Sequence, residues 1–263
     1  MHKQLAGFGL LFFTIFFYAC SVNKATIDDS LKSVFEQNKS TGCFAFLNNA
    51  SGEITVYNPN YDTARLSPGG SFHIPLTLFA LQKGTIADEN QSFSDSASGL
   101  KCPSLSDAFL NDEDSCFSYI AQQMGKTDFQ NFLDTLHYGN AKSGKDFYQC
   151  WNNGSLLISP DEQLGLMKKL YFNQLPFRES VHQSVCRLMK SENSNLYNLS
   201  WKISRPTKMA DGKFSSWCTG WIEENRHVYF FVTYVESSQG SNNISAQITR
   251  QILTQYEFFQ GKK

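Results

Sequence analysis

Strand-like patterns lie at both ends of this chain, and helical patterns fill the region between them. Near the N-terminus, apolar residues run through 43–47 and 54–57, and the turn-rich segment 48–52 separates them, which predicts a hairpin. Strand patterns return at 215–223 and 227–235. The order strands, helices, strands predicts an α+β fold in which both ends of the chain complete one antiparallel sheet.

The helical segments are identified by apolar residues that recur every three or four positions. The first is predicted to begin near Phe72, because Pro75 is tolerated only in a first turn and Gly84 suits a C-terminal cap. Ser159 before Pro160 fits a capped start with proline at the first helical position. The other predicted helices cover residues 115–124, 128–136, 160–171, 179–189 and 244–258.

Length and composition predict one domain with a single well-formed core, over residues 29–263. The chain has 263 residues, of which 41% are hydrophobic and 18% charged. Its formal charge of −1 gives no electrostatic footprint for nucleic acid, so no nucleic-acid partner is expected. There is no Cys-x-x-Cys, and the five histidines lie far apart, so the sequence predicts no metal site and no cofactor.

The first twenty residues predict export. His2 and Lys3 form a basic start, residues 5–17 are apolar but too few for a permanent span, and Ala19-Cys20 ends the segment. This resembles a bacterial lipoprotein signal, with Cys20 as the lipidated mature N-terminus and residues 21–28 as a mobile tether. The bulky residues before Cys20 leave a cleaved signal peptide or an uncleaved anchor open. The predicted location is the membrane, facing the periplasm or the cell surface.

The cysteines beyond Cys20 permit disulfides but do not define them. Their number is even, which in an exported chain is compatible with bridges, and a small buried apolar side chain is the alternative for each. The connectivity stays open. These residues are Cys43, Cys102, Cys116, Cys150, Cys186 and Cys218.

Residues 68–75 read Pro-Gly-Gly-Ser-Phe-His-Ile-Pro and begin a series of ordered matches to one family. Further matches are 64–90 around this segment, Ser115-Cys116-Phe117, Tyr138-Gly139-Asn140, Trp151 with Gly154-Ser155-Leu156, 158–163, 175–177, Lys202-Ile203-Ser204 and 217–221. Through them the chain resembles class D β-lactamases and the related penicillin-sensor domains. From Asp29 onward, the resemblance implies a β-lactamase/transpeptidase-like fold. Its five-to-seven-stranded antiparallel sheet is flanked by helices, and the active site lies where the sheet meets an all-helical subregion.

Two replacements in this motif remove the expected chemistry. The family pattern is Pro-x-Ser-x-x-Lys-x-Pro, with the serine as nucleophile and the lysine as base. Here Gly70 takes the serine position and His73 the lysine position. Glycine offers no nucleophile, and an imidazole lacks the primary amine that becomes carboxylated in the family. Acyl transfer requires a nucleophile and a neighbouring base, so we predict no catalytic residue with confidence here.

Ser71 is the fallback nucleophile for a residual enzyme. It lies about 100° further round a helix than Gly70, and His73 is only two residues on, pointing to nearly the opposite side. A helix therefore cannot hydrogen-bond these two side chains to each other. His73 can serve as a base near neutral pH, or it can be a satisfied core residue.

The resemblance implies five substrate-binding positions: Ser115, Trp151, Lys202, Ser204 and Ser245. Ser115 matches the serine of the Ser-x-Val motif, and Trp151 matches the indole that contacts the carboxylated lysine. Lys202 and Ser204 stand at the first and last positions of Lys-Thr-Gly, and Ser245 stands where an arginine holds the β-lactam carboxylate. Alternative roles are a helix cap for Ser115, a solvated strand residue for Lys202 and a core residue for Trp151.

These observations predict an exported lipoprotein with a penicillin-recognising domain that has lost acyl transfer and serves as a binding or structural module. Its expected partners are the membrane, through the lipid on Cys20, and a peptidoglycan peptide or a β-lactam. Two alternatives stay open. One is a serine β-lactamase that uses Ser71, and the other is a sensor that binds cell-wall peptide or β-lactam without turnover.

Overall fold

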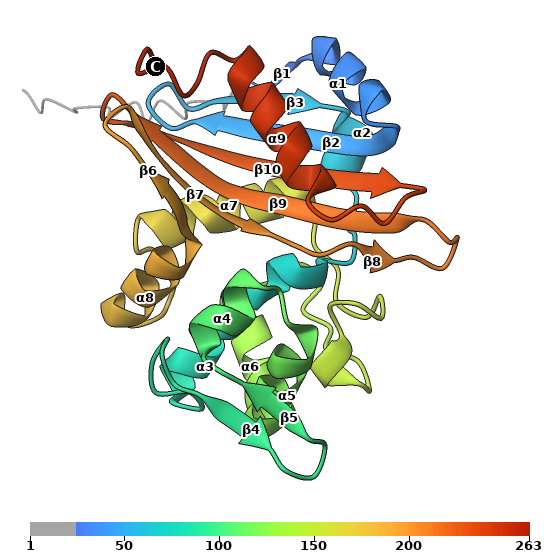
Figure 1. The fold of residues 1–263 in the computed structure, drawn as a ribbon, viewed down its shortest axis with the longest axis vertical. Coiled ribbons are helices and arrows are strands. Elements are labelled where there is room, and N and C mark those ends of the chain that lie inside the picture. Colours follow the sequence, from blue (N-terminus) through green and yellow to red (C-terminus); the bar gives the residue numbers. More distant parts are fainter. Residues whose placement is uncertain (1–24) are drawn as a thin grey trace, which may run out of the picture.

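A large mixed sheet forms the centre of the molecule. The structure is a computed structural model that describes residues 25–263. The strands are β1 (Ala25–Ile27), β2 (Ser40–Asn48), β3 (Glu53–Tyr57), β6 (Lys190–Asn193), β7 (Tyr197–Ile203), β8 (Thr207–Lys208), β9 (Phe214–Glu224) and β10 (His227–Ser237). Their order is β1-β3-β2-β10-β9-β7-β6, with β8 paired to β9 (Figure 1). Only β1 and β3 run parallel among these pairs.

The pairing of β2 with β10 joins the two ends of the chain. The register runs continuously from Ser40 opposite Ser237 to Asn48 opposite Tyr229. Such a central antiparallel pair makes the N-terminal hairpin and the C-terminal hairpin parts of one sheet. The predicted α+β class, with both ends in one antiparallel sheet, is confirmed.

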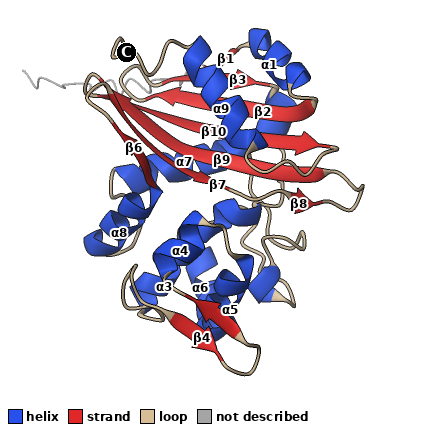
Figure 2. Ribbon diagram, in the orientation of Figure 1, coloured by secondary structure: helices blue, strands red, loops and turns tan. Residues whose placement is uncertain are grey.

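Helices cover both faces of the sheet (Figure 2). On one face, α1 (Lys32–Gln37) and α9 (Ile244–Gln255) lie over the strands, with a core that includes Phe35, Phe44, Phe231, Ile248 and Ile252. On the other face, α7 (Pro160–Tyr171) packs against β10, β2 and β9. Side chains that alternate along each strand therefore enter two separate cores.

The all-helical subregion lies beyond α7 on that second face (Figure 1). Its helices are α3 (His73–Lys83), α4 (Leu105–Leu110), α5 (Asp114–Met124) and α6 (Lys126–Leu136), and α8 (Glu179–Met189) lies beside them. The short hairpin of β4 (Phe93–Asp95) and β5 (Leu100–Cys102) closes its outer side. A disulfide between Cys102 and Cys116 ties β5 to α5.

Local sequence signals explain where the helices that frame the site begin and end. Ser159 and Glu162 form a capping box at the start of α7, with Pro160 at the first helical position. Gly84 ends α3 in the left-handed conformation, where a side chain would be strained. The helix that was expected to begin near Phe72 begins instead with a 3₁₀ turn, η2 (Gly69–Phe72), ahead of α3.

Two features differ from the sequence predictions. The sheet has eight strands among the described residues rather than five to seven, because β1, β6 and β8 are short edge strands. The tether was expected to extend to Asp28, yet residues 25–27 form β1 on β3 and Asp28 caps the next turn, so this part of the prediction was wrong. The predicted lipoprotein signal, including Cys20, lies outside the described residues. None of the helices within residues 25–263 has the length and apolar character needed to cross a membrane.

Candidate active site

Three segments meet where the helical subregion contacts the sheet. One is η2 followed by the first turn of α3, which carries Gly70 and His73. The second is the loop between α4 and α5, which contains Asp112. The third is the end of β7, which carries Lys202. Gly70, His73 and Lys202 are all buried, so the place where a catalytic centre is expected is closed to solvent.

Gly70 faces the carboxylate of Asp112. A Cβ atom built at Gly70 would lie 2.2 Å from each oxygen of Asp112, far inside van der Waals contact. Asp112 itself has a left-handed backbone (φ 55°), which aspartate adopts more readily than most residues. The loop therefore places a carboxylate in the space that any side chain at position 70 would need.

The Asp112 carboxylate is surrounded by positive and hydrogen-bonding groups. Lys202 Nζ lies 2.6 Å from its Oδ1, and the backbone N–H of Arg205 donates to its Oδ2 at 2.6 Å. The same Lys202 ammonium donates to the carbonyl of Phe109 at 2.5 Å and lies over that residue's ring. Both charges are thereby matched in a dry environment, which is the condition under which a buried ion pair is tolerated.

His73 bridges two carboxylates. Its Nδ1 lies 2.9 Å from Asp112 Oδ1, and its Nε2 is hydrogen-bonded with Asp114 Oδ1 at 3.0 Å. Each ring nitrogen thus faces an acceptor, and only the doubly protonated imidazolium offers a proton to both. The ring also stacks on Phe117, with centroids 3.8 Å apart and planes 8° apart. Both nitrogens of His73 therefore lie beside carboxylate oxygens, and Phe117 covers one face of the ring.

Asp114 holds the outer side of this cluster. Its Oδ1 also accepts from Trp151 Nε1 at 2.9 Å, and its Oδ2 accepts from Asn152 at 3.0 Å. Trp151 is fully buried and stacks on Phe72. The charged cluster, defined as His73, Asp112, Asp114 and Lys202, is therefore held together by ion pairs and hydrogen bonds within the protein.

The electrostatics of the charged cluster lower the pKa values of its two carboxylates, Asp112 and Asp114. Burial alone would raise the pKa of Asp112, but the nearby Lys202 and His73 hold that pKa well below its usual range. Burial likewise opposes ionisation of Asp114, and its hydrogen bond with His73 lowers the pKa. Burial lowers the pKa of Lys202, and the Asp112 carboxylate partly offsets this. The arrangement can anchor charges, and Gly70 supplies no nucleophile to it.

Comparison with known proteins identifies the family. The model of the penicillin binding protein transpeptidase domain matches residues 42–254. The chain belongs to this family. It is 32% identical to β-lactamase OXA-20 of Pseudomonas aeruginosa over 189 residues, which are 70% of this chain and 69% of that protein. It is 26% identical to the regulatory protein BlaR1 of Bacillus licheniformis over 238 residues, which are 86% of this chain but only 38% of BlaR1.

The solved structures show the same fold. A class D β-lactamase from Sebaldella termitidis superposes with a TM-score of 0.82 at 21% identity, covering 90% of this chain and 100% of that one. The fold is therefore that of class D β-lactamases, and the penicillin-binding family has both β-lactamases and a regulatory protein among the relatives of this chain. The charged cluster stands where the sheet and the helical subregion of this fold meet.

The structure brings together Gly70, His73, Trp151 and Lys202 among the residues predicted from the sequence. It places Ser71 in the same turn, but fully buried and with its hydroxyl donating to the carbonyl of Pro68 at 2.7 Å. As expected, Ser71 and His73 are not hydrogen-bonded to each other, since both His73 nitrogens face carboxylates.

Three predicted substrate-binding residues are not part of the charged cluster. Ser115 is exposed on α5, because the helix begins at Asp114 and turns the serine outward. Ser204 is buried, and its hydroxyl accepts the backbone N–H of Trp217 at 2.7 Å, which ties the chain after β7 to β9. Ser245 is fully buried in the first turn of α9, on the face of the sheet opposite Lys202.

Sequence reasoning missed Asp112, Asp114 and Asn152. A usable signal existed, because a buried lysine and a buried histidine require counter-charges. The acidic run 112–114 lies immediately before the predicted helix at Ser115. The motif match begins at Ser115 and therefore does not include the loop that precedes it.

Proposed function

We propose that this protein is an exported lipoprotein whose penicillin-binding-type domain is catalytically inactive and serves as a binding or structural module. One observation carries this proposal. The Asp112 carboxylate fills the space in front of Gly70 and is held there by Lys202, His73 and the Arg205 backbone. A nucleophile cannot enter that space without displacing the carboxylate.

A turnover assay tests the inactivity. Purified protein is incubated with a fluorescent penicillin and, separately, with nitrocefin, beside an active class D β-lactamase. We expect no covalent adduct and hydrolysis at the background rate, and Ser71→Ala should change neither result. In subtilisin, loss of the nucleophile and the base lowers the rate on the order of 10⁶-fold. An intact catalytic centre would therefore be easily distinguished from the background rate. An adduct on Ser71 would overturn the proposal and establish the serine β-lactamase alternative.

The sensor alternative is favoured by the BlaR1 relative, which is a regulatory protein by name. It requires that a penicillin or a cell-wall peptide bind without turnover. Calorimetry with benzylpenicillin and with a muramyl pentapeptide distinguishes the two roles. Saturable binding that is lost when Trp151→Ala opens the charged cluster would support a sensor, and absence of binding to both probes would support a structural module.

Export and lipidation rest on the leader alone. Mass spectrometry of the protein isolated from membranes of its native host is expected to show a diacylglyceryl group on Cys20 as the first residue. The matched control is Cys20→Ser, which should be neither lipidated nor retained in the membrane fraction. A mature chain that begins at Ser21, or one that retains the leader, would contradict this part of the proposal.

A further inference from the structure

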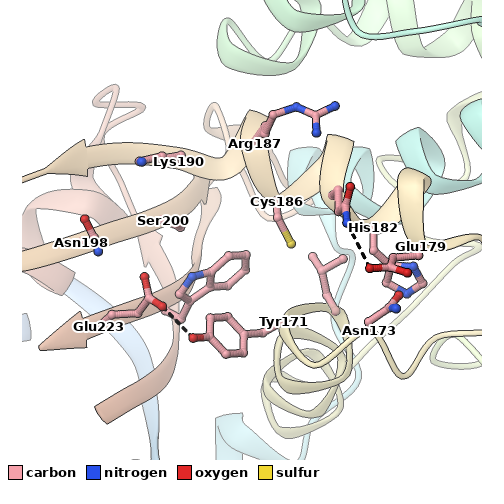
Figure 3. Close-up of a pocket in the computed structure, with 13 residues that line it drawn as sticks. Tyr171, Asn173, Glu179, His182, Cys186, Arg187, Lys190, Asn198, Ser200 and Glu223 are labelled. Atoms are coloured by element: carbon pink, nitrogen blue, oxygen red, sulfur yellow. Dashed lines mark hydrogen bonds between the residues drawn. The ribbon is translucent and has the colours of Figure 1, made fainter. Parts of the chain in front are cut away.

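A second polar region lies at the other end of β7, and it is hollow. A cavity of about 550 Å³ is bordered by α7, α8, β7 and β9 (Figure 3). It opens on the same face of the sheet as the charged cluster. Asn198, Ser200 and Lys202 occupy every second position of β7, so their side chains lie on one face. The volume is within the range of small-molecule sites.

One side of this cavity presents an ionisable acceptor without a cation. Glu223 on β9 accepts a hydrogen bond from the hydroxyl of Tyr171 at 2.6 Å. Within residues 25–263 no lysine, arginine or histidine lies within ion-pair distance of Glu223. Asn198 stands directly opposite Glu223 in the register of β7 and β9, and its buried Oδ1 has no partner in the described structure. Two acceptors thus lie side by side.

The opposite side presents a third acceptor. His182 is 2% exposed, and its Nδ1 lies 3.1 Å from the carbonyl of Arg178, so that nitrogen carries the proton. Its Nε2 is buried and has no hydrogen-bond partner in the described part of the chain. Figure 3 shows His182 and Glu223 on opposite sides of the cavity, with Tyr171 and Cys186 between them. A buried acceptor without a donor is costly, and a ligand that supplies the donor removes this cost.

The surface between the two sides is aromatic and apolar. Trp221 and Leu170 line the cavity together with the ring of Tyr171. Indole and phenol rings attract organic cations as well as apolar groups. Of the two cationic residues at the rim, Arg187 is paired with Glu89 at 2.6 Å, and Lys190 is exposed.

We propose that this cavity binds a small organic amine. Its protonated amine would lie at Glu223 and Asn198, its apolar or aromatic body on Trp221 and Leu170, and a hydroxyl or second N–H at its far end would donate to His182. An ammonium supplies the positive charge that Glu223 lacks, and the far donor satisfies the unpartnered Nε2.

Three probes test the charge and the far donor. Tyramine carries the amine, the ring and a hydroxyl, phenethylamine lacks the hydroxyl, and 3-(4-hydroxyphenyl)propionate replaces the amine by a carboxylate. Binding to the full chain is measured by protein-observed NMR titration. We expect tyramine to bind most tightly, phenethylamine several-fold more weakly, and the carboxylate at least about tenfold more weakly than tyramine. Equal binding of the acid, or no binding of either amine, would overturn the proposal.

Substitutions locate the site. Glu223→Gln keeps an acceptor for the Tyr171 hydroxyl but removes the charge, so tyramine binding should fall about tenfold or more. His182→Leu should reduce tyramine binding toward that of phenethylamine and leave phenethylamine unchanged. The matched control is Glu53→Gln, an exposed carboxylate on β3, which should change neither. Unaltered binding in Glu223→Gln would contradict the proposal, and thermal unfolding of each variant verifies its fold.

Discussion

Strand β7 borders two polar regions of opposite character. At its C-terminal end, Lys202 belongs to the charged cluster, in which Asp112 contacts Lys202 and His73, and His73 also contacts Asp114, all at 3.0 Å or less. At its N-terminal half, Asn198 and Glu223 face a cavity with unpartnered acceptors. The first region pairs its buried lysine with a carboxylate inside the protein, which is expected of a structural element. Within the described residues, the second leaves the carboxylate of Glu223 without a cation and the acceptors of Asn198 and His182 without donors.

The difference lies in how each region fills its space. Position 70 carries no side chain, and the α4–α5 loop fills the space in front of it with Asp112. The positive charge of Lys202, which is at the Lys-Thr-Gly position by resemblance, then pairs with this carboxylate. A group with a role in chemistry elsewhere in the family thus acts as the counter-charge of a buried ion pair.

The largest effect is expected when the filled region is reopened. Gly70→Ser with His73→Lys restores nucleophile and base, yet the new Cβ would still lie 2.2 Å from the Asp112 oxygens. Adding Asp112→Ser removes the obstruction. We expect the triple variant to be acylated by a fluorescent penicillin about 10³-fold above background, part of the roughly 10⁶-fold that the two groups contribute in subtilisin. The double variant should stay near background.

The comparison of double and triple variants makes this prediction specific. Restoring both motif residues would recover acylation only if the space at position 70 were open, and Asp112 occupies that space. Equal acylation of the two variants would show that Asp112 moves aside freely and does not block the site. Circular dichroism of both variants shows whether each is folded before its reactivity is compared.

The second prediction compares isosteric changes in the two regions. Asp112→Asn leaves Lys202 buried without its counter-charge, so the free energy of unfolding should fall by about 3–5 kcal/mol. Glu223→Gln removes a half-buried carboxylate that has no cationic partner in the described part of the chain, so no ion pair is broken. The free energy of unfolding should therefore change by no more than about 1 kcal/mol. Urea denaturation at pH 7 measures both. Similar losses in the two variants would contradict the distinction between a satisfied and an unsatisfied region.

The stability difference between the original protein and Asp112→Asn should depend on pH, because the pKa of Asp112 differs between the folded and unfolded states. That pKa is lower in the folded state than the ordinary value of 3.8, so the carboxylate stabilises the fold above this value. The contribution is lost as the pH falls below 3.8 and through the folded-state pKa. The difference between the original protein and Asp112→Asn should therefore narrow in acid. A difference that is independent of pH down to complete protonation of the unfolded chain would exclude this electrostatic origin.

The sequence predicted the helices around the site better than the side-chain contacts within it. The end of α3 follows from Gly84, and the start of α7 follows from Ser159 with Pro160, which act within one turn. The positions of Gly70 and His73 followed from a linear motif. Asp112 could not be placed in the same way, because its contact with Gly70 depends on how the α4–α5 loop folds over η2. The cavity beside α8 depends equally on three distant elements, and no local pattern marks it.

Another buried carboxylate, Asp62, extends the comparison, because its Oδ1 has no hydrogen-bond partner within residues 25–263. Asp62 on α2 (Pro59–Asp62) is 7% exposed, and burial, together with Asp161, raises its pKa to about 7. An acid with a raised pKa destabilises the fold when it is ionised, from the unfolded value of 3.8 upward. Asp62→Asn should therefore stabilise the protein by about 2 kcal/mol at pH 8. The gain should shrink as the pH falls from 7 to 4.

Thermal unfolding across this pH range measures the effect, and Asp211→Asn is the control because that carboxylate is exposed. The control should leave the unfolding temperature nearly unchanged at every pH. A constant gain from Asp62→Asn across the whole range would indicate improved packing and not the removal of a buried charge.

The smallest effect is expected at Arg205, which contacts the charged cluster only through its backbone. Its guanidinium pairs with Glu113 at 2.8 Å, but the two side chains are 56% and 41% exposed. Exposed pairs contribute about 0–1 kcal/mol, and added salt weakens them. Arg205→Ala keeps the N–H that donates to Asp112, so the loss should be about 0.5 kcal/mol or less and should vanish in high salt. A loss comparable with that of Asp112→Asn would mean that the guanidinium, too, neutralises the carboxylate, and that the satisfied region extends to the surface.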